Sequence, residues 1–419
     1  MENDEVISRE TNRDHATYPD VDYRGKLILA PMVHAGNLAM RLECLSYGAD
    51  LVYGEEIIDR RISSTVRTYN DAYNTVEYRS RKDGTFVFST NREERGKVVF
   101  QLGTADATQA LLGAQKVVQD VCAVDVNMGC PKSFSVKGGM GAALLSTPLV
   151  ATDILKTLRR NLPCPVTCKI RLLDTMQKTI DFALSCEDCG IAAIAVHARE
   201  KHERPAHAAR WDSFRPLKES LSIPLIANGD FMTRRSADKF RKEVGWADSL
   251  MIARGALWNP AIFLPEEADA PTRLEVIQKY IRRAITLGHV FQNIKYTVLQ
   301  MISQDGNLQW NEAMQATRSP RDICDVFDLA EWYSAISPSL PQAACTLQYY
   351  RAREIVEDNA FTFAAPAGGG GGGCVAEGEE QQQKENGVEG HPVKRRRLDV
   401  DAGVDGDEVC AGGASENGT

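Results

Sequence analysis

The feature that most limits the fold of this chain is a repeated alternation of short apolar runs with segments of helical periodicity. Eight runs, often β-branched, fall at Leu27–Ala30, Leu51–Tyr53, Val98–Leu102, Ala123–Val126, Val166–Ile170, Ala193–Val196, Pro224–Ala227 and Leu250–Ala253. Helical patterns lie between them, for example at Leu38–Tyr47, Ala105–Val121, Ala151–Asn161 and Lys178–Cys189. Continuous apolar strands alternating with helices indicate a parallel sheet covered on both faces. Eight such units favour a closed (β/α)8 TIM barrel over an open sheet.

In a barrel of this kind the functional residues follow the strands, because the loops at the carboxyl ends build the site. Candidate residues follow seven of the eight runs. They are Pro31 and Met32, Gln101, Asn127 and Cys130, Lys169 and Arg171, His197 and Arg199, Asn228 to Asp230, and Arg254. Polar residues that merely end a strand explain one or two of these positions, but not the whole set.

The most specific stretch follows the fourth run and reads Asn127-Met128-Gly129-Cys130-Pro131-Lys132. Proline ends the strand because it has no N–H for the ladder. A glycine-rich segment at residues 137–145 then allows the backbone to approach a flat or phosphorylated ligand. A thiol at this place can donate a proton, act as a nucleophile or bind a metal, although a lone cysteine is more often a buried structural residue.

The chain divides into four parts by composition. Residues 1–22 are polar and predicted to be disordered, and residues 23–268 form the barrel. Residues 269–360 carry amphipathic helices, with apolar positions at Leu274, Ile277, Ile281, Ile285, Val298, Met301, Ile323 and Val326. Basic residues there (Lys279, Arg282, Arg283, Lys295, Arg318 and Arg321) are either a nucleic-acid contact or a solvated face, and the residues alone favour neither. Residues 361–419 are of low complexity and predicted to be disordered.

The net charge of -8 does not exclude a nucleic-acid partner, because it is unevenly distributed. From Ala364 onward there are 11 acidic and 5 basic residues, so the tail carries most of the negative charge. A nearly neutral remainder can still hold a basic face.

The cysteines and the termini predict the compartment. There are 11 scattered cysteines, residues 1–22 lack the apolar stretch of a secretory signal, and no run is long enough for a membrane span. We expect a reduced, cytoplasmic protein with no membrane contact. Cys186 and Cys189 form a CxxC without a second ligand pair, which favours core cysteines over a metal site. The basic cluster Lys394, Arg395, Arg396 and Arg397 is a nuclear-import signal, which would add the nucleus as a location, a nucleic-acid patch, or a chance cluster.

The Gly-Cys-Pro run, taken with six other runs in order, resembles the tRNA-dihydrouridine synthases, flavin enzymes that reduce uridines in tRNA. The other runs are Leu29–Met32, Phe100–Gly103, Thr167–Arg171, Ala195–Arg199, Ile226–Asp230 and Met251–Pro260. The resemblance covers roughly residues 25–335. It implies FMN as cofactor, NADPH as reductant, tRNA as partner and a helical tRNA-binding domain after the barrel. Residues 127–132 and 137–145 look most like the eukaryotic branch that acts at position 20 of the D-loop. We expect a monomer without metal.

The strand ends also supply what FMN requires. Phosphate sites in this fold follow strands seven and eight, and backbone N–H groups and arginine bind phosphate. An amide and a cation suit the pyrimidine edge of the flavin ring. The resemblance assigns the same positions to FMN. They are Pro31, Met32 and Val33 at the ring, Gln101 and Lys169 at its pyrimidine edge, His197 between ring and phosphate, and Asn228, Gly229, Asp230, Ala253 and Arg254 at the phosphate.

The implied reaction passes a hydride from N5 of the reduced flavin to C6 of uracil, and a proton to C5. In the family this proton comes from the cysteine, which is Cys130 here. A thiol with an ordinary pKa of about 8.5 is mostly protonated near neutrality, as an acid must be. Asn127 and Arg171 would bind the uracil edge, and Arg199 the adjacent backbone or base. The base must leave its stack to reach the barrel mouth.

Two alternatives stay open. One is an FMN barrel that acts on a free pyrimidine, against which the basic helical region, the Gly-Cys-Pro run and the absence of iron–sulfur cysteine spacing argue. The other is a non-catalytic tRNA-binding protein, against which the retention of Cys130, Lys169 and His197 argues.

Overall fold

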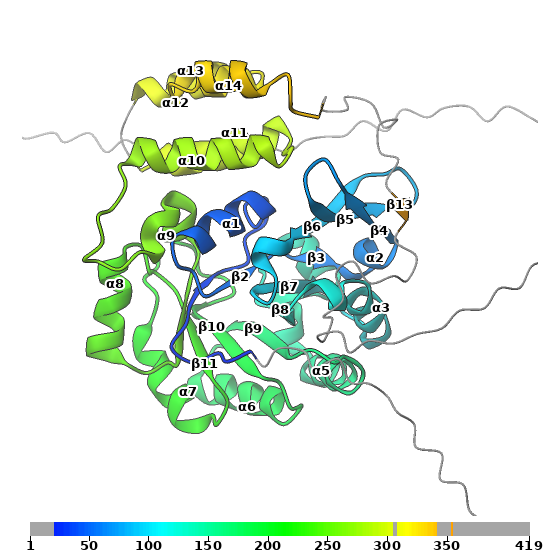
Figure 1. Ribbon diagram of the computed structural model, residues 1–419. Coiled ribbons are helices and arrows are strands. Elements are labelled where there is room, and N and C mark those ends of the chain that lie inside the picture. The colour runs from blue at the N-terminus through cyan, green and yellow to red at the C-terminus, as the bar shows by residue number, and fades with distance from the viewer. Residues whose placement is uncertain (1–20, 305–307, 342–352, 355–419) are drawn as a thin grey trace, which may run out of the picture. The chain divides into compact units, whose positions relative to one another are not determined.

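The computed structural model describes residues 21–304, 308–341 and 353–354 of the chain and contains a closed parallel barrel (Figure 1). Its strands are β1 (Leu27–Leu29), β2 (Leu51–Tyr53), β7 (Val98–Gly103), β8 (Ala123–Met128), β9 (Val166–Leu172), β10 (Ala193–Glu200), β11 (Leu225–Asn228) and β12 (Ser249–Ile252). Neighbours along the ring pair in parallel, and β2 pairs with β7 to close it. The predicted eight-stranded barrel is confirmed, and each strand overlaps one of the predicted runs.

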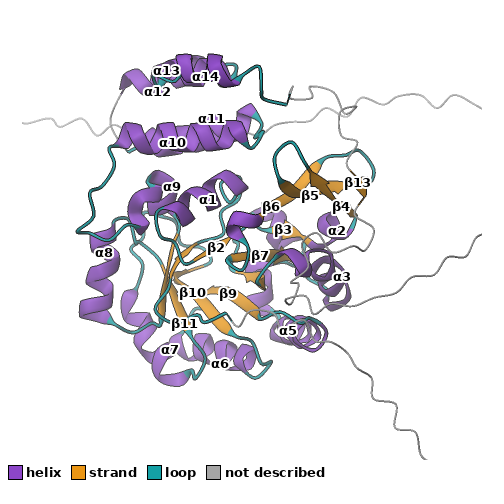
Figure 2. Cartoon of the chain, in the orientation of Figure 1, coloured by secondary structure: helices purple, strands orange, loops and turns teal. Residues whose placement is uncertain are grey.

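Helices cover the outside of the barrel strands (Figure 2). They are α1 (Leu38–Ser46), α3 (Ala107–Val117), α5 (Pro148–Asn161), α6 (Met176–Glu187), α7 (Phe214–Ser220), α8 (Arg234–Lys239) and α9 (Arg254–Trp258). Local capping starts several of them: Asn37 accepts a hydrogen bond from the N–H of Met40, and Thr175 from the N–H of Lys178. The strands are largely apolar because helices bury one face and the barrel interior buries the other, and all six residues of β8 are buried, its Asp and Asn included.

The connection between β2 and β7 contains elements that the sequence analysis did not predict. A two-residue strand, β3 (Ile57–Ile58), pairs with β7 beyond β2. After the short helix α2 (Asp59–Ser63), the strands β4 (Thr65–Asn70), β5 (Thr75–Ser80) and β6 (Phe86–Asn91) form an antiparallel sheet, to which β13 (Arg353–Glu354) adds an edge. This second sheet packs into the same core as the barrel through apolar residues such as Val76 and Tyr78, which are fully buried.

The predicted helical region after the barrel is confirmed. It comprises α10 (Arg273–Thr286), α11 (Phe291–Ile302), α12 (Leu308–Ala316), α13 (Pro320–Val326) and α14 (Ala330–Ile336). Capping boxes at Thr272 with Glu275 and at Ser319 with Asp322 start α10 and α13. Of the predicted apolar positions, Leu274 and Val326 are half-buried and the other six are buried.

The helical region is joined to the barrel by a buried acid. The side chain of Glu43 on α1 is fully buried, and its carboxylate pairs with Nε of Arg283 at 2.8 Å and Nζ of Lys279 at 3.3 Å. Lys279 also lies 3.9 Å from the ring centroid of Tyr47. Two of the basic positions weighed as nucleic-acid contacts are therefore bound to the barrel.

Several predictions concern residues that the structure does not describe. The tail, the basic cluster at residues 394–397 and residues 1–20 fall outside the described residues. Within the described ranges, no helix is long and apolar enough to cross a bilayer. No group of three metal-ligating side chains occurs in the same ranges, and Cys186 and Cys189 are both buried.

Candidate active site at the carboxyl ends of the barrel strands

Most of the predicted site residues meet at the carboxyl-end rim of the barrel, together with Asp125, which was not predicted, because parallel strands all end on the same side. They form two groups. The thiol side comprises Gln101, Asp125, Asn127, Cys130 and Lys169, from β7, β8 and β9. The arginine side comprises His197, Arg199, Asp230 and Arg254, from β10, β11 and β12.

Asn127 fixes the turn that carries Cys130. Its Oδ1 accepts hydrogen bonds from the backbone N–H of Gly129 at 3.0 Å and of Cys130 at 2.9 Å. Its Nδ2 donates to Oε1 of Gln101 at 3.1 Å. Asn127 was predicted to bind uracil. In the structure its amide oxygen holds the backbone of the turn that carries Cys130.

The buried carboxyl of Asp125 anchors the amides of Gln101 and Asn127. Nε2 of Gln101 donates to Oδ2 of Asp125 at 2.9 Å, and Oγ1 of Thr167 donates to Oδ1 of the same residue at 2.7 Å. Burial raises the pKa of Asp125 to about 6, although the two hydrogen bonds favour its ionised form. The orientation of Gln101 is thus set from both ends.

Cys130 is the one half-exposed cysteine in the described part of the chain, where the others are buried. Burial raises the pKa of its thiol, and the neighbouring carboxylate of Glu56 raises it further. The side chain is therefore a protonated thiol near neutrality, which is the form that a general acid needs.

Lys169 is a cation without a partner at the same rim. Among the described residues, none hydrogen-bonds or ion-pairs with its ammonium group. Burial lowers its pKa to about 8, with a further contribution from Arg171. Arg171 itself is held by the carbonyl oxygens of Gly129 at 2.8 Å and Glu200 at 3.0 Å, and burial lowers its pKa to about 10.

The arginine side is built on Asp230, whose backbone lies in the left-handed region with φ of 56°. Nη2 of Arg199 contacts both carboxylate oxygens of Asp230, at 2.7 and 2.6 Å, and Nη2 of Arg254 donates to Oδ1 at 2.9 Å. Arg199 is only 3% exposed, and its Nε donates to the carbonyl of His207 at 2.7 Å. Arg199 was predicted to contact tRNA; the structure directs its donors into the protein.

These residues border a cavity of about 220 Å³ at the ends of β9 to β12. Its lining residues are Arg171, His197, Arg199, Glu203, Arg204, Pro205, Asn228, Gly229, Asp230, Phe231, Met232, Met251, Ala253 and Arg254. Six of the eleven predicted cofactor residues therefore share one cationic cavity, whereas the half-buried Pro31, Met32 and Val33 follow β1 and do not line it.

The backbone around this cavity leaves no room for a side chain at Gly229. Its φ is +136°, and a Cβ atom there would lie 2.8 Å from Cβ of Ala209. His197 lies alongside, with Nε2 at 3.2 Å from Nη1 of Arg199, and burial together with the surrounding cations lowers its pKa far below the ordinary value. Asn228 is tied to β12, since its Nδ2 donates to the carbonyl of Met251 at 2.8 Å.

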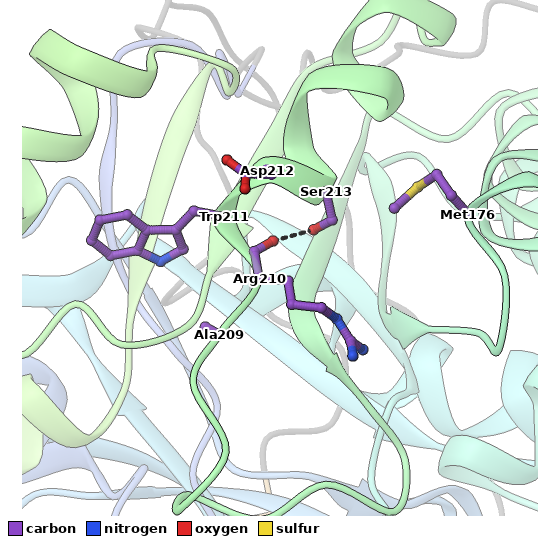
Figure 3. Close-up of a pocket in the computed structure, with 6 residues that line it drawn as sticks. All are labelled: Met176, Ala209, Arg210, Trp211, Asp212 and Ser213. Carbon is purple, nitrogen blue, oxygen red and sulfur yellow. Dashed lines mark hydrogen bonds between the residues drawn. The ribbon is translucent and has the colours of Figure 1, made fainter.

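A larger depression of about 530 Å³ is lined by Met176 and residues 209–213 (Figure 3). The drawn side chains diverge, and the bond between them joins the Ser213 hydroxyl to the Arg210 carbonyl at 2.6 Å. No set of polar side chains converges there, so we place the site at the rim and not in this depression. Trp211 supports the rim from this side by donating from Nε1 to the carbonyl of Gly229 at 2.9 Å.

Sequence reasoning missed two residues of the thiol side. Asp125 was taken as part of an apolar strand, and nothing local marks its contact with Gln101. Glu56 follows the second strand, the one barrel unit for which no candidate was named. The rule that functional residues follow each strand would have found it.

Known proteins resemble this chain in sequence over most of the described residues. The family model described as dihydrouridine synthase (Dus) matches residues 28–324. The chain is 35% identical over 324 residues to the tRNA-dihydrouridine(20) synthase (NAD(P)+) of Saccharomyces cerevisiae, covering 72% of this chain and 83% of that one. It is 30% identical to the protein of the same description from Schizosaccharomyces pombe, covering 77% and 68%. It is also 30% identical to the human tRNA-dihydrouridine(20a/20b) synthase (NAD(P)+)-like protein, covering 71% and 88%. A histamine dehydrogenase structure from Rhizobium sp. 4-9 aligns over 59% of this chain and 47% of that one with a TM-score of 0.42 and 9% identity, too distant to bear on function.

Proposed function

The chain belongs to the dihydrouridine synthase family, and from that premise we propose that it reduces uridine to 5,6-dihydrouridine at position 20 of the tRNA D-loop. FMN is the proposed cofactor and NADPH the proposed reductant. The observation that carries this function is the half-exposed thiol of Cys130, whose pKa burial and Glu56 raise, at the barrel rim beside the ammonium group of Lys169, for which the described residues offer no partner.

The residues present fit FMN. Its phosphate is a dianion, and the cationic cavity offers Arg254, which is 34% exposed, and the space that Gly229 leaves open. The positive charge of Lys169 suits the pyrimidine edge of the flavin ring, where negative charge collects on reduction. When bound and reduced by NADPH, FMN would supply the hydride that goes to C6 of uracil.

The chain's own residues would supply the proton and hold the base. Cys130 donates the proton to C5, and Asn127 keeps the thiol in place by holding two backbone N–H groups of its turn. Arg171 uses two of its five N–H donors on backbone carbonyls, which leaves others for the uracil edge. Arg199 supports the phosphate side by fixing Asp230, because its donors are engaged there.

tRNA is the proposed partner, and its target base would have to leave the stack to reach the rim. The enzyme is proposed to act as a monomer in the cytoplasm, with import into the nucleus through Lys394 to Arg397. A free-pyrimidine dehydrogenase is not favoured by any contact described above.

The test is the dihydrouridine content of an unmodified tRNA transcript after incubation with protein, FMN and NADPH, mapped by mass spectrometry. Wild type should form dihydrouridine at position 20. Cys130→Ala should lose about 10²–10⁴-fold in rate, the usual contribution of a general acid, while retaining flavin absorbance. Turnover of free uracil without turnover of tRNA, or no product from a flavin-loaded protein that binds tRNA, would overturn the proposal.

A further inference from the structure

The strand that precedes Glu56 is interrupted, and the interruption directs this residue toward the thiol side. Along β7, Val99 pairs with Tyr53 of β2 and Leu102 pairs with Ile57 of β3. Three residues, Gly54 to Glu56, thus oppose two residues of β7. One extra residue on one strand is a β-bulge, a feature that turns a side chain away from its regular direction and is frequent beside active sites.

The carboxylate of Glu56 lies against the loop that carries Cys130. Its Oε1 accepts a hydrogen bond from Oγ of Ser135 at 3.2 Å. A Cβ atom at Gly103 would lie 2.7 Å from the same Oε1, so the carboxylate fits only because β7 ends in glycine. Oε2 is buried from solvent and has no hydrogen-bond partner among the described atoms. One carboxylate oxygen is therefore held, and the other is available to a neighbour.

Cys130 is that neighbour. Ser135 and Cys130 pack on the same glycine, since a Cβ atom at Gly141 would lie 2.4 Å from Oγ of Ser135 and 3.0 Å from Cβ of Cys130. Burial raises the pKa of the Glu56 carboxyl and a hydrogen bond from the Cys130 thiol lowers it, while burial and the Glu56 charge both raise the pKa of the thiol.

The charges around the thiol oppose one another. From β9, the cations Lys169 and Arg171 favour the thiolate. The Ser135 hydroxyl and the backbone N–H of Lys132 also favour it by hydrogen bonding. Burial and the Glu56 carboxylate favour the thiol, and burial together with this charge outweighs the other groups. Glu56 is the acidic side chain with the largest effect on the pKa of Cys130.

We propose that Glu56 is a positioning residue for the acid: it accepts the thiol hydrogen bond and keeps Cys130 protonated until the substrate takes the proton. The inference rests on the proposed function and adds to it how the acid is maintained. The two side chains together hold one proton. When the S–H bond breaks and the proton forms a C–H bond at C5, a thiolate and a carboxylate are left side by side. Their repulsion raises the proton affinity of the pair, which then takes one proton from water and restores the thiol.

The experiment is the pH dependence of iodoacetamide alkylation at Cys130 in the full-length, flavin-loaded protein. Peptide mass spectrometry isolates this cysteine from the other ten. Only the thiolate reacts, so the midpoint of the rate reports the thiol pKa. In Glu56→Gln the midpoint should fall by about one pH unit, seen as about tenfold faster alkylation at pH 7.5, because the negative charge is gone and the shape is kept.

Glu55→Gln is the matched control. Glu55 is the next residue in the same bulge, but its Oε2 accepts from the backbone N–H of His34 at 2.9 Å instead of facing the thiol. Glu55→Gln should therefore leave the alkylation midpoint of Cys130 unchanged. Glu56→Asp, which keeps the charge on a shorter side chain, should give an intermediate midpoint and remains informative if Glu56→Gln does not fold. A midpoint in folded Glu56→Gln or Glu56→Asp that equals the wild-type value would overturn the proposal.

A second readout separates this idea from the proposed function. The high-pH limb of kcat for tRNA should move down with the thiol midpoint in Glu56→Gln, while KM for tRNA changes less than about twofold. If Glu56→Gln shifts the alkylation midpoint but the wild type forms no dihydrouridine, the interaction of Glu56 with Cys130 is supported and the tRNA activity is rejected. If the wild type forms dihydrouridine but Glu56→Gln leaves the alkylation midpoint unshifted, the tRNA activity is supported and the role of Glu56 is rejected.

Discussion

The two sides of the barrel rim differ in how their charged side chains are paired. On the arginine side, both Arg199 and Arg254 contact the carboxylate of Asp230. On the thiol side, neutral amides hold one another, while Lys169 has no partner among the described residues and Cys130 stays protonated. The strands on both sides are parallel and equally buried, so the difference arises from which side chains follow them.

This contrast indicates a division of labour. A group that binds a fixed charge works best when its position is set in advance, and ion pairing with Asp230 does this for the arginines. A group that changes protonation must keep its proton available, and a salt bridge would remove that freedom. The expected effects of substitutions differ accordingly on the two sides.

The largest expected effect on stability is at Asp230. Asp230→Asn removes the carboxylate charge and leaves Arg199, which is 3% exposed, without its counter-ion. Asparagine tolerates the left-handed backbone there, so the change isolates the charge. Unfolding by urea at pH 7 should show a loss of about 3–5 kcal/mol. Cys130→Ala, on the thiol side, should lose no more than about 1 kcal/mol. Equal losses would abolish the contrast between the sides.

Gly229→Ala tests the steric demand of the arginine side. The new Cβ atom would meet Ala209 at 2.8 Å on a backbone with φ of +136°, and we expect a loss of about 1–3 kcal/mol together with weaker flavin binding. Thermal unfolding and flavin titration measure the two effects. Gly190→Ala is the control: its φ is +78° but nothing lies within 4 Å, so it carries the backbone strain without the clash. Equal losses would show that backbone strain alone is responsible.

Asn127→Ala tests the amide chain of the thiol side. It leaves two backbone N–H groups of the Cys130 turn without their acceptor, which should cost about 1–2 kcal/mol. The rate of dihydrouridine formation should fall about tenfold, while flavin affinity stays within about twofold, because the phosphate site is on the other side and Asp125 still holds Gln101. Asn161→Ala, an exposed position whose amide bonds only to its own helix, should change neither. Loss of flavin in Asn127→Ala would show that the two sides are not separate.

The smallest effect, and one of opposite sign, is expected at Lys169. Its folded-state pKa of about 8 lies below that of an unfolded lysine, about 10.4, so the unfolded state binds more protons between these values. Wild-type stability without flavin should therefore rise with pH from about 8 to 10.5, and Lys169→Met should lack this rise. At pH 7 the variant should be as stable as wild type or more so, by on the order of 1 kcal/mol.

Urea unfolding of the flavin-free protein at pH 7 and pH 10 measures this difference, with the exposed Lys178→Met as control. Flavin affinity should fall in Lys169→Met alone. A loss of stability at pH 7 in that variant would mean that Lys169 is paired in solution and that the thiol side is not open as described.

The sequence predicted the barrel well because each strand is a local signal. Runs such as Ala193 to Val196 are apolar on both faces only when helices cover them, and proline or glycine often marks their ends. The antiparallel strands β4 to β6 were missed because Thr75–Ser80 alternates apolar with polar residues over one short stretch, which is also compatible with an exposed loop.

The site was predicted as a set of residues but not as a set of contacts. The position of Arg199 after a strand suggested a substrate contact, yet its partner Asp230 lies 31 residues further along the chain. The bond from Gln101 to Asp125 spans 24 residues, and the register shift that presents Glu56 depends on how two strands pair with β7. Local patterns carry no information on such pairings.

The buried acid Glu43 has a consequence for how this protein can be divided. Its two cations come from α10, more than 230 residues away, so a barrel cut after residue 268 would lose both counter-ions of Glu43 together with the helix that lies against α1. Such a fragment would be expected to unfold or to aggregate, even though every strand of the ring is present. The helices after the barrel thus act as part of its folding unit. A recombined protein that carries a different carboxyl-terminal segment would have to bring basic side chains to the same face of α1, or lose Glu43 at the same step.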